Sequence, residues 1–538
     1  MNKEEFKTDV LINGAGPTGL MMACLLSVHK IPFRIIDKKV KRDEYSGAMI
    51  IHARSMEILH QIGLSIKFLK EGVIARKINV QFNYKSPFTF DIADFGNGYS
   101  LFPYIFILEQ SKTEKLLRNF LEGHEHKVED GTTLLSFSQK RGIVTSVLKT
   151  PDGNGEIVSS RFLIGAGGST SIVRRQLKIP FYGITHSDLL FVSDSGADLP
   201  SLSAEMMFSF SEHHSLGFFP LPNNRWRIDG SIPHLGKSAE KISFENLDNY
   251  LDNNPNLNLQ LSNSTWFSAF RSHSRYAPAF KHHHCFLVGD AAHIHSPVGA
   301  QGMNAGLHDA YNLAWKLAFY LKGRASARIL DTYQHERLPV AIKIIRSTDK
   351  VYLWIANNDQ LLKTMRLYLL PIVLKLFVFL MTRIKGIQKA VFMAISGVGI
   401  SYRESRLSAN FRRRGIFDSS PLPGDRLPNF QYFVGSRLFN LHEKIKYTAY
   451  TLLVFGVKEM PAAIHLIIEK YSDILVGEII SQGPGTEEAY KVMVRNQYAC
   501  YLVRPDMHIA WRSDSLNARV LEIYLERFLI AANELHEA

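Results

Sequence analysis

The feature that most constrains this chain is a glycine-rich turn near its amino terminus, Gly14-x-Gly16-x-x-Gly19. The turn directly follows the apolar run 10–12, which is typical of a strand buried on both faces of a parallel sheet. Gly14 permits a tight turn, Gly16 lets backbone N–H groups approach a pyrophosphate, and Gly19 lets a helix pack closely on the strand. Asp37 ends the next predicted strand, where a carboxylate can accept hydrogen bonds from a ribose. We therefore expect a βαβ unit that binds a dinucleotide rather than an ordinary glycine turn.

A second glycine-rich loop lies much further along the chain, at 289–304. Asp290 follows the apolar run 286–288. Gly299 and Gly302 come just before a helical pattern that runs from residue 304 to residue 321. A carboxylate at a strand end, followed by such a turn, offers an acceptor for hydroxyl groups and a cluster of N–H donors. Asp290 could instead cap a helical turn, with the glycines serving only the turn itself. The concentration of these residues in one loop favours a binding role.

The order of apolar patterns predicts an α/β chain with a Rossmann-like domain assembled from distant segments. Three further short apolar runs indicate more strands of its parallel sheet: 33–36, 162–164 and 286–288. Alternating runs between them predict an inserted lobe built on an antiparallel sheet. We expect a discontinuous nucleotide-binding domain at 1–75, 105–180 and 280–350, with the inserted lobe at 76–104 and 181–279. A helical connector at 351–420 then leads to a carboxyl-terminal domain at 421–538.

The carboxyl-terminal part reads as a compact α/β domain. Its patterns predict strands at 451–455 and 473–480 with a helix at 462–470 between them. A hairpin at 500–511, which turns around Pro505 and Asp506, and a final helix at 515–532 follow. It contains no CxxC pair, so we expect no dithiol redox chemistry there.

Composition excludes several classes of protein and partner. Apolar residues make up 46% and charged residues 21%, close to globular averages, which excludes wholesale disorder, collagen and coiled coil. Lys and Arg number 63 against 50 Asp and Glu, but no single basic block carries the excess, so we expect no nucleic-acid partner. The three cysteines, Cys24, Cys285 and Cys500, are too few for a disulfide framework, and the first apolar run is too short for a signal peptide. A reducing, cytoplasmic location is expected.

The most apolar stretch of the chain is 367–381, which is fifteen residues long and contains Pro371 and Lys375. A membrane-spanning helix needs about 20 apolar residues, so we do not expect a span. A buried helix that packs on the main body is the favoured interpretation. The alternative is a peripheral membrane contact, supported by basic residues at the flanks: Arg366, Arg383 and Lys385.

Three segments together, 14–19, 289–304 and 330–337, resemble the class A FAD-dependent aromatic hydroxylases, the para-hydroxybenzoate and phenol hydroxylase family. The Gly-Asp-Ala-Ala-His run that begins at Gly289 is highly characteristic of that family. The segment 502–512 is similar to the carboxyl-terminal thioredoxin-like domain of the phenol, hydroxyphenylpropionate and polyketide hydroxylases. The resemblance therefore covers nearly the whole chain, and it implies a thioredoxin-like tail.

The resemblance also implies a cofactor, a reaction and a binding site. NADPH or NADH would reduce bound FAD, and O2 would add at flavin C4a to give a hydroperoxide that hydroxylates a phenolic or polyketide-type ring. A small aromatic substrate and O2 are the implied partners, in a monomer or homodimer. The residues that match the family's FAD-contacting positions are Gly14, Gly16, Gly19, Asp37, Arg54, Gln110, Asp290, Pro297, Gly299, Gly302, Met303 and Asn304.

The chain departs from the family pattern at two positions. Gly47 stands where the family usually has an arginine, and Gly167 stands where it usually has an aspartate that supports binding of flavin and reduced nicotinamide. Arg174 or Arg175 could supply positive charge near a dinucleotide phosphate, or either could be a solvated helix residue. These departures leave open the alternative of a flavin-binding accessory protein with weakened NAD(P)H turnover. The apolar stretch 367–381 leaves open another, a peripheral membrane hydroxylase of a lipophilic ring.

The sequence does not assign a catalytic base. Four aromatic residues in the predicted lobe are candidates to line a substrate pocket, although aromatic residues at such positions more often belong to the core: Tyr104, Phe208, Phe219 and Trp226. His293 and His295 belong to the family loop, and the run 282–284 reads as a solvated turn, so we expect no metal site.

Overall fold

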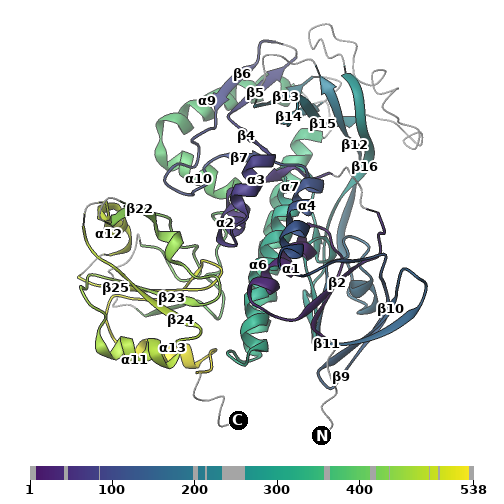
Figure 1. The fold of residues 1–538 in the computed structure, drawn as a ribbon. Coiled ribbons are helices and arrows are strands. Elements are labelled where there is room, and N and C mark those ends of the chain that lie inside the picture. Colours follow the sequence, from purple (N-terminus) through teal and green to yellow (C-terminus); the bar gives the residue numbers. More distant parts are fainter. Residues whose placement is uncertain are drawn as a thin grey trace.

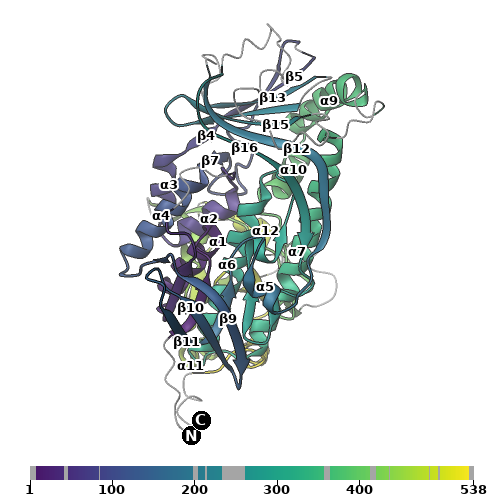
Figure 2. The ribbon, with the colours of Figure 1, turned by 90° about the vertical axis from the view of Figure 1, so that its right-hand side faces the viewer.

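The computed structural model (Figures 1 and 2) describes residues 8–41, 47–83, 85–197, 204–211, 215–232, 261–356, 361, 364–411, 420–434, 437–483, 485–494 and 497–531.

A parallel sheet forms the centre of the nucleotide-binding domain. β1 (Thr8–Asn13) lies between β2 (Phe33–Asp37) and β11 (Gly155–Gly165), parallel to both, and β18 (Cys285–Leu287) continues the sheet beyond β11. Three of the four strands contain the apolar run that predicted them, and β18 overlaps the run 286–288 but ends at Leu287, so the assembly of one sheet from distant segments is confirmed. Short or antiparallel strands extend the sheet: β8 (Glu129–Asp130), β9 (Thr133–Lys140), β10 (Ile143–Lys149) and β17 (Lys281–His282).

Helices cover the sheet and lead from it to the other parts of the molecule. α1 (Pro17–Val28) packs beside α6 (Gln301–Leu321), and both lie between the parallel sheet and the carboxyl-terminal part (Figure 1). α6 begins three residues before the predicted helix and ends where predicted. The remaining helices of this region are α2 (Ala53–Gln61), α3 (Ser65–Glu71), α4 (Gln110–Glu122), α5 (Ile172–Gln176) and α7 (Arg328–Ala356).

The inserted lobe is an eight-stranded sheet in the order β19-β16-β12-β15-β14-β13-β5-β6. Its strands are β5 (Lys77–Phe82), β6 (Phe88–Asp91), β12 (Tyr182–Ala197), β13 (Glu205–Phe210), β14 (Ser215–Leu221), β15 (Arg225–Ile232), β16 (Leu261–Tyr276) and β19 (His293–Ile294). Neighbouring strands are antiparallel, as predicted, except that β5 and β13 run parallel. These two are not joined by a hairpin, because the nucleotide-binding domain intervenes between them in the chain. Residues 233–260 of the predicted lobe lie outside the described residues.

A small sheet joins the lobe to the nucleotide-binding domain. It consists of β3 (Ile50–Ile51), β7 (Ile105–Ile107) and β4 (Val73–Ala75).

The carboxyl-terminal part forms its own sheet in the order β20-β26-β25-β23-β24. The predicted strands and hairpin are present as β23 (Tyr450–Phe455), β24 (Leu475–Ile480), β25 (Ala499–Val503) and β26 (Ile509–Ser513), with α11 (Ala462–Lys470) between the first two. The final helix is shorter than predicted, at α13 (Ala518–Glu526). β20 (Ala409–Phe411) pairs with β26, so the segment predicted as a helical connector contributes a strand to this sheet. The other elements are β21 (Gln431–Val434), β22 (Arg437–Asn440), η5 (Leu441–Lys444) and α12 (Glu487–Met493).

The prediction that the most apolar stretch is a buried helix is wrong. The stretch forms a π-helical turn, η4 (Met365–Leu369), continued by α9 (Leu370–Arg383) and followed by α10 (Lys385–Ile395). Among its apolar residues only Leu367, Val378 and Met381 are buried. Figure 2 shows α9 at the outer edge of the molecule, where no other described element covers it. The apolar composition of the stretch led to a prediction of burial, whereas most of its apolar side chains lie on the surface of the described structure.

Candidate functional site

A cavity of about 620 Å³ opens where β1, β2 and β18 end. Ligand pockets typically measure about 300–1,000 Å³ and lie outside the carboxyl ends of the strands in open α/β sheets. Seven of the predicted site residues line it: Gly14, Gly16, Asp37, Gln110, Asp290, Gly302 and Met303. The structure thus brings the two glycine-rich loops to one place, although they are far apart in sequence.

The first glycine-rich turn has the geometry that its spacing predicted. Gly14 has a φ of +112°, and a Cβ atom there would lie 2.4 Å from the carbonyl oxygen of Ala166. A Cβ atom on Gly19 would lie 1.9 Å from the carbonyl oxygen of Gly14, so α1 can approach the turn only because this residue is glycine. Gly16 faces open space, and no side chain caps the amino end of α1. The first N–H groups of the helix are therefore free of capping side chains beside the cavity, an arrangement that favours a phosphate group.

Asp37 holds the turn in place from the end of β2. One of its carboxylate oxygens accepts the N–H of Ala15 at 2.6 Å, and the other accepts the N–H of Lys39 at 2.9 Å. The carboxylate still borders the cavity, where its remaining lone pairs can receive hydroxyl groups.

The second loop brings Asp290 to the cavity from the end of β18. The residue lies in the short helix η3 (Gly289–Ala291), and its side chain is exposed to the cavity. The cavity walls surround this carboxyl group and limit its hydration, which raises its pKa. Gly289 and Gly306 both lie against Thr18 of α1, because a Cβ atom on either glycine would fall within 2.6 Å of the Thr18 hydroxyl oxygen. The loop, α1 and α6 are therefore packed so closely that they fix the floor of the cavity.

The amino end of α6 points toward the same space. Ala300 precedes the helix in a left-handed conformation with a φ of 51° and provides no side-chain cap. The Asn304 amide group donates to the carbonyl oxygens of Ala300 and Ile50, and its oxygen accepts the N–H of His52. Asn304 is thereby fully occupied in fixing the loop, while Gly302 and Met303 line the cavity.

A buried chain of polar groups, whose roles the sequence did not reveal, leads from the cavity into the protein. His295 lines the cavity, and its Nε2 lies 3.0 Å from Nδ1 of His293. Nε2 of His293 lies 2.7 Å from Asp309, which also accepts a hydrogen bond from Arg337 at 2.7 Å. Burial, reinforced by His293, lowers the pKa of His295 to about 3, so this ring is neutral at physiological pH. Burial would raise the pKa of Asp309, but His293 and Arg337 hold it well below its usual range.

Comparison with known proteins identifies the family. Residues 7–348 match a family model described as an FAD binding domain. Pentachlorophenol 4-monooxygenase of Sphingobium chlorophenolicum is 32% identical over 492 residues, or 89% of this chain and 86% of that protein. The chain belongs to this family of FAD-dependent aromatic monooxygenases. A second relative, 6-methylpretetramide 4-monooxygenase of Streptomyces rimosus, is 32% identical over 401 residues, or 74% of this chain and 71% of that protein.

The monooxygenase fold extends over the whole chain. The structure of aklavinone-11 hydroxylase in a ternary complex with FAD and aklavinone superposes with a TM-score of 0.77, covering 98% of this chain and 99% of that one at 23% identity. The cavity fits the cofactor of the family: an open Gly16 before an uncapped helix suits the pyrophosphate, and carboxylates at the ends of β2 and β18 suit hydroxyl groups.

Five predicted FAD contacts of the monooxygenase do not line the cavity: Gly19, Arg54, Pro297, Gly299 and Asn304. For Arg54 the structure gives a different role. Its guanidinium is buried, pairs with Glu57 at 3.0 Å and donates to the carbonyl oxygen of Asp506 at 2.7 Å. Arg54 therefore binds the carboxyl-terminal part of the chain. Sequence could not show this, because its partner lies more than 400 residues away.

Of the two arginines considered for a dinucleotide phosphate, only Arg175 lines the cavity. Arg174 donates to the carbonyl oxygens of Ala291 and Ser169 and lies 3.8 Å from the ring centroid of Phe181. It is therefore a structural residue. Its pKa is lowered, chiefly by burial.

The two positions that depart from the family pattern both border the cavity. Gly47 and Gly167 are among its lining residues. The carbonyl oxygen of Gly47 accepts a hydrogen bond of 3.0 Å from Arg227, whose guanidinium is paired with Asp194 at 2.6 Å. The lobe strand β15 thus places a guanidinium group next to the position at which the family usually has an arginine.

None of the four aromatic pocket candidates lines this cavity. Phe219 pairs with Arg227 across β14 and β15, so it shares the lobe face that reaches Gly47. Phe208 contacts Phe219 edge to face at 5.6 Å and lies on the same side. Trp226 belongs to the opposite face, because successive side chains of a strand alternate. Within the described residues there is no cluster of side chains that could hold a metal ion.

Proposed function

We propose that this monooxygenase hydroxylates a phenolic or polyketide-type aromatic ring with O2 and either NADPH or NADH. The observation that carries the proposal is the single cavity that both glycine-rich loops line, in a chain of this family. The names of the two relatives support the substrate class, since one acts on pentachlorophenol and the other on 6-methylpretetramide.

Each part of FAD would have its own partners in the cavity. The amino end of α1 at Gly16 would receive the pyrophosphate, Asp37 the adenosine ribose, and Asp290 the ribityl chain. The amino end of α6, at Gly302 and Met303, would face the isoalloxazine and favour negative charge on it. When bound, FAD supplies the redox chemistry, since it takes electrons from the nicotinamide and activates O2. The protein excludes water from the ring to be hydroxylated.

Asp229 is our candidate for the group that accepts the proton of a ring hydroxyl. It lies on the same face of β15 as Arg227, which reaches the cavity wall at Gly47. One of its carboxylate oxygens has no hydrogen-bond partner among the described residues. Burial raises the pKa of this carboxyl group to about 7, even though Arg227 opposes the shift. A carboxylate that titrates near neutral pH suits general base catalysis.

We also propose the domain division that the sequence suggested, with the strand β20 added to the carboxyl-terminal domain. Support for a thioredoxin-like tail comes from the parallel unit β23-α11-β24 followed by the antiparallel hairpin β25-β26 and α13. A reducing, cytoplasmic location is supported by three free, buried cysteines in the part that the structure describes.

Anaerobic mixing with NADPH or NADH tests the proposed function. We expect the absorbance of oxidised flavin to disappear faster when a phenolic compound is present, and a hydroxylated product to be detected by mass spectrometry once O2 is admitted. Bound flavin that no nicotinamide reduces, with any ring compound, would contradict the proposal. Fast NAD(P)H turnover by the unsubstituted protein would exclude the alternative of a flavin-binding accessory protein.

The role of Asp229 requires a separate measurement. The hydroxylation rate of the parent should rise with pH through about 7, where this carboxyl group loses its proton. In Asp229→Asn the rate should fall by about 100-fold and lose this pH dependence, while flavin content stays unchanged. An unchanged pH profile would show that another group takes the proton.

A further inference from the structure

The helix α9 presents an apolar surface that no described residue covers. Ile372 is 66% exposed, Leu376 58% and Phe379 55%. These side chains recur at helical spacing and so form one stripe along the helix. Further exposed apolar residues widen it at both ends and sides: Tyr368, Leu369, Val373, Phe377 and Ile384. Soluble monomers rarely expose so large a continuous apolar patch unless it contacts another molecule.

The opposite side of this helical pair is firmly seated on the protein. Val378 and Met381 of α9 are buried. In α10, Phe392 is buried between Phe95 and Tyr99, with ring centroids 5.9 and 6.2 Å away. Gln388 donates to the carbonyl oxygen of Phe95. The exposed stripe is therefore the outer face of an ordered element.

The charge of the helical segment itself has a single sign. Between Asp359 and Glu404 the sequence contains no acidic residue. Three exposed basic side chains lie on α9 or at the start of α10: Lys375, Arg383 and Lys385. A second copy of this chain would bring these cations against one another, whereas an anionic lipid surface would neutralise them.

We propose that α9 and α10 dock the protein on a bilayer that contains anionic lipids. α9 would lie in the plane of the membrane, with its apolar stripe among the acyl chains and the basic residues Lys375 and Arg383 at the headgroups. By length and composition alone the helix Met365–Arg383 could cross a membrane. A lysine at its centre and a face packed on the protein favour the in-plane arrangement. The proposal stands independently of the substrate.

One end of this helical pair lies near the glycine-rich loop 289–304, called the flavin loop below. Gln301, the first residue of α6, donates to the carbonyl oxygen of Ile395 at the end of α10. The end of α10 therefore contacts the amino end of α6, where Gly302 and Met303 line the cavity.

Vesicle flotation of the FAD-loaded full chain tests the proposal without any activity measurement. We expect the protein to float with vesicles of phosphatidylcholine and phosphatidylglycerol, and to float poorly with phosphatidylcholine alone. Ile372→Ser combined with Leu376→Ser should reduce binding by more than about tenfold, since each substitution removes an aliphatic side chain that the bilayer would bury. Lys375→Gln combined with Lys385→Gln should weaken binding to vesicles that contain phosphatidylglycerol by about 30-fold, since each lysine near an anionic surface contributes about 1 kcal/mol.

Ile157→Ser is the matched control, because Ile157 is 61% exposed on β11, far from α9 in sequence. It should float as the parent does, and unchanged flavin content in every variant would show that the fold is intact. The proposal is overturned if the parent does not float with either kind of vesicle. It is also overturned if sedimentation shows a dimer that the Ile372 and Leu376 substitutions dissociate, because a second copy would then occupy the stripe.

Discussion

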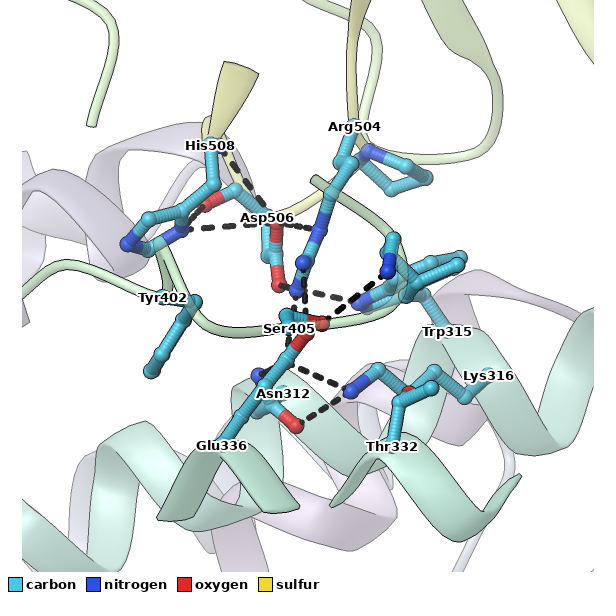
Figure 3. Close-up of polar contacts among 12 residues, drawn as sticks. Asn312, Trp315, Lys316, Thr332, Glu336, Tyr402, Ser405, Arg504, Asp506 and His508 are labelled. Atoms are coloured by element: carbon cyan, nitrogen blue, oxygen red, sulfur yellow. Dashed lines mark hydrogen bonds and ion pairs between the residues drawn. The ribbon is translucent and has the colours of Figure 1, made fainter. Parts of the chain in front are cut away.

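Arg504 is the residue whose removal should most loosen the carboxyl-terminal part from the rest of the molecule. Figure 3 shows its guanidinium between two carboxylates. Two of its nitrogens donate to Glu336 of α7 at 2.7 and 2.9 Å, and Nε donates to Asp506 at 2.9 Å. All three side chains are almost fully buried, at 0 to 1% exposure. We consider the substitution Arg504→Met, which retains much of the volume and removes the charge.

The expected loss of stability follows from the buried charges that remain after the substitution. Lys316 still pairs with Glu336 at 2.7 Å, but one cation then faces two buried carboxylates. Removing one partner of a buried ion pair costs about 3–5 kcal/mol. Arg403→Met is the matched control, because Arg403 pairs with Asp425 but is 54% exposed, and such pairs contribute about 0–1 kcal/mol. Adding Glu336→Gln to Arg504→Met should restore part of the lost stability.

The cost should also depend on pH. Burial would raise the pKa of Glu336, but Arg504 and Lys316 hold it below its usual range. A depressed carboxyl pKa contributes stability above the unfolded value of about 4.3 and loses it as the pH falls through the folded value. The difference between parent and variant should therefore be constant near neutral pH and shrink in acid.

Urea unfolding followed by tryptophan fluorescence provides the measurement, since the buried Trp315 lies against the Arg504 guanidinium and Trp511 is buried in β26 of the carboxyl-terminal part. Arg504→Met should lower the free energy of unfolding by at least about 2 kcal/mol more than Arg403→Met does. Equal effects of the two substitutions would refute the reasoning, because the buried pair would then contribute no more than an exposed one.

Three further predictions test other parts of the structure. Gly14→Ala should abolish FAD retention, because its Cβ atom would lie 2.4 Å from the carbonyl oxygen of Ala166, whereas Gly386→Ala, in open space, should not; the ratio of flavin to protein absorbance measures both. Asp229→Asn should raise the thermal midpoint above that of the parent at pH 8, and this gain should vanish below about pH 4. The reason is that a carboxyl group with a raised pKa in the folded protein lowers stability as the pH rises from its unfolded pKa to its folded pKa, and the substitution removes that group. Cys24, Cys285 and Cys500 should resist a thiol reagent at pH 8 and react after denaturation, because burial raises the pKa of each thiol; fast labelling of the native protein would contradict this.

The features that sequence predicted best are those that local geometry decides. Gly14 and Gly19 are required by contacts within one βαβ unit, where a Cβ atom would meet backbone 2.4 and 1.9 Å away. Asp37 ends the second strand of the same unit and accepts a hydrogen bond from its turn. Spacing along the chain is enough to specify such contacts, because the elements involved are consecutive.

The features that sequence missed depend on which surfaces meet. Nothing near Arg54 in the chain shows that its guanidinium binds the carbonyl oxygen of Asp506. The apolar residues of α9 look the same whether a protein core or another molecule covers them. His293 and His295 illustrate the intermediate case: the resemblance places both in the family loop, but only the fold brings Asp309 to His293.

The same long-range contacts link the carboxyl-terminal part to the cofactor site. The helix α2 contacts the flavin loop through Ser55, which donates to Asn304 at 2.7 Å, and contacts the carboxyl-terminal part through Arg54 and Asp506. If Arg504→Met loosens the hairpin that contains Asp506, α2 loses part of its contact with the carboxyl-terminal part. FAD should then dissociate faster from Arg504→Met than from Arg403→Met in dilution experiments followed by flavin fluorescence. Equal dissociation rates would show that the carboxyl-terminal part is attached to the monooxygenase without supporting its cofactor site.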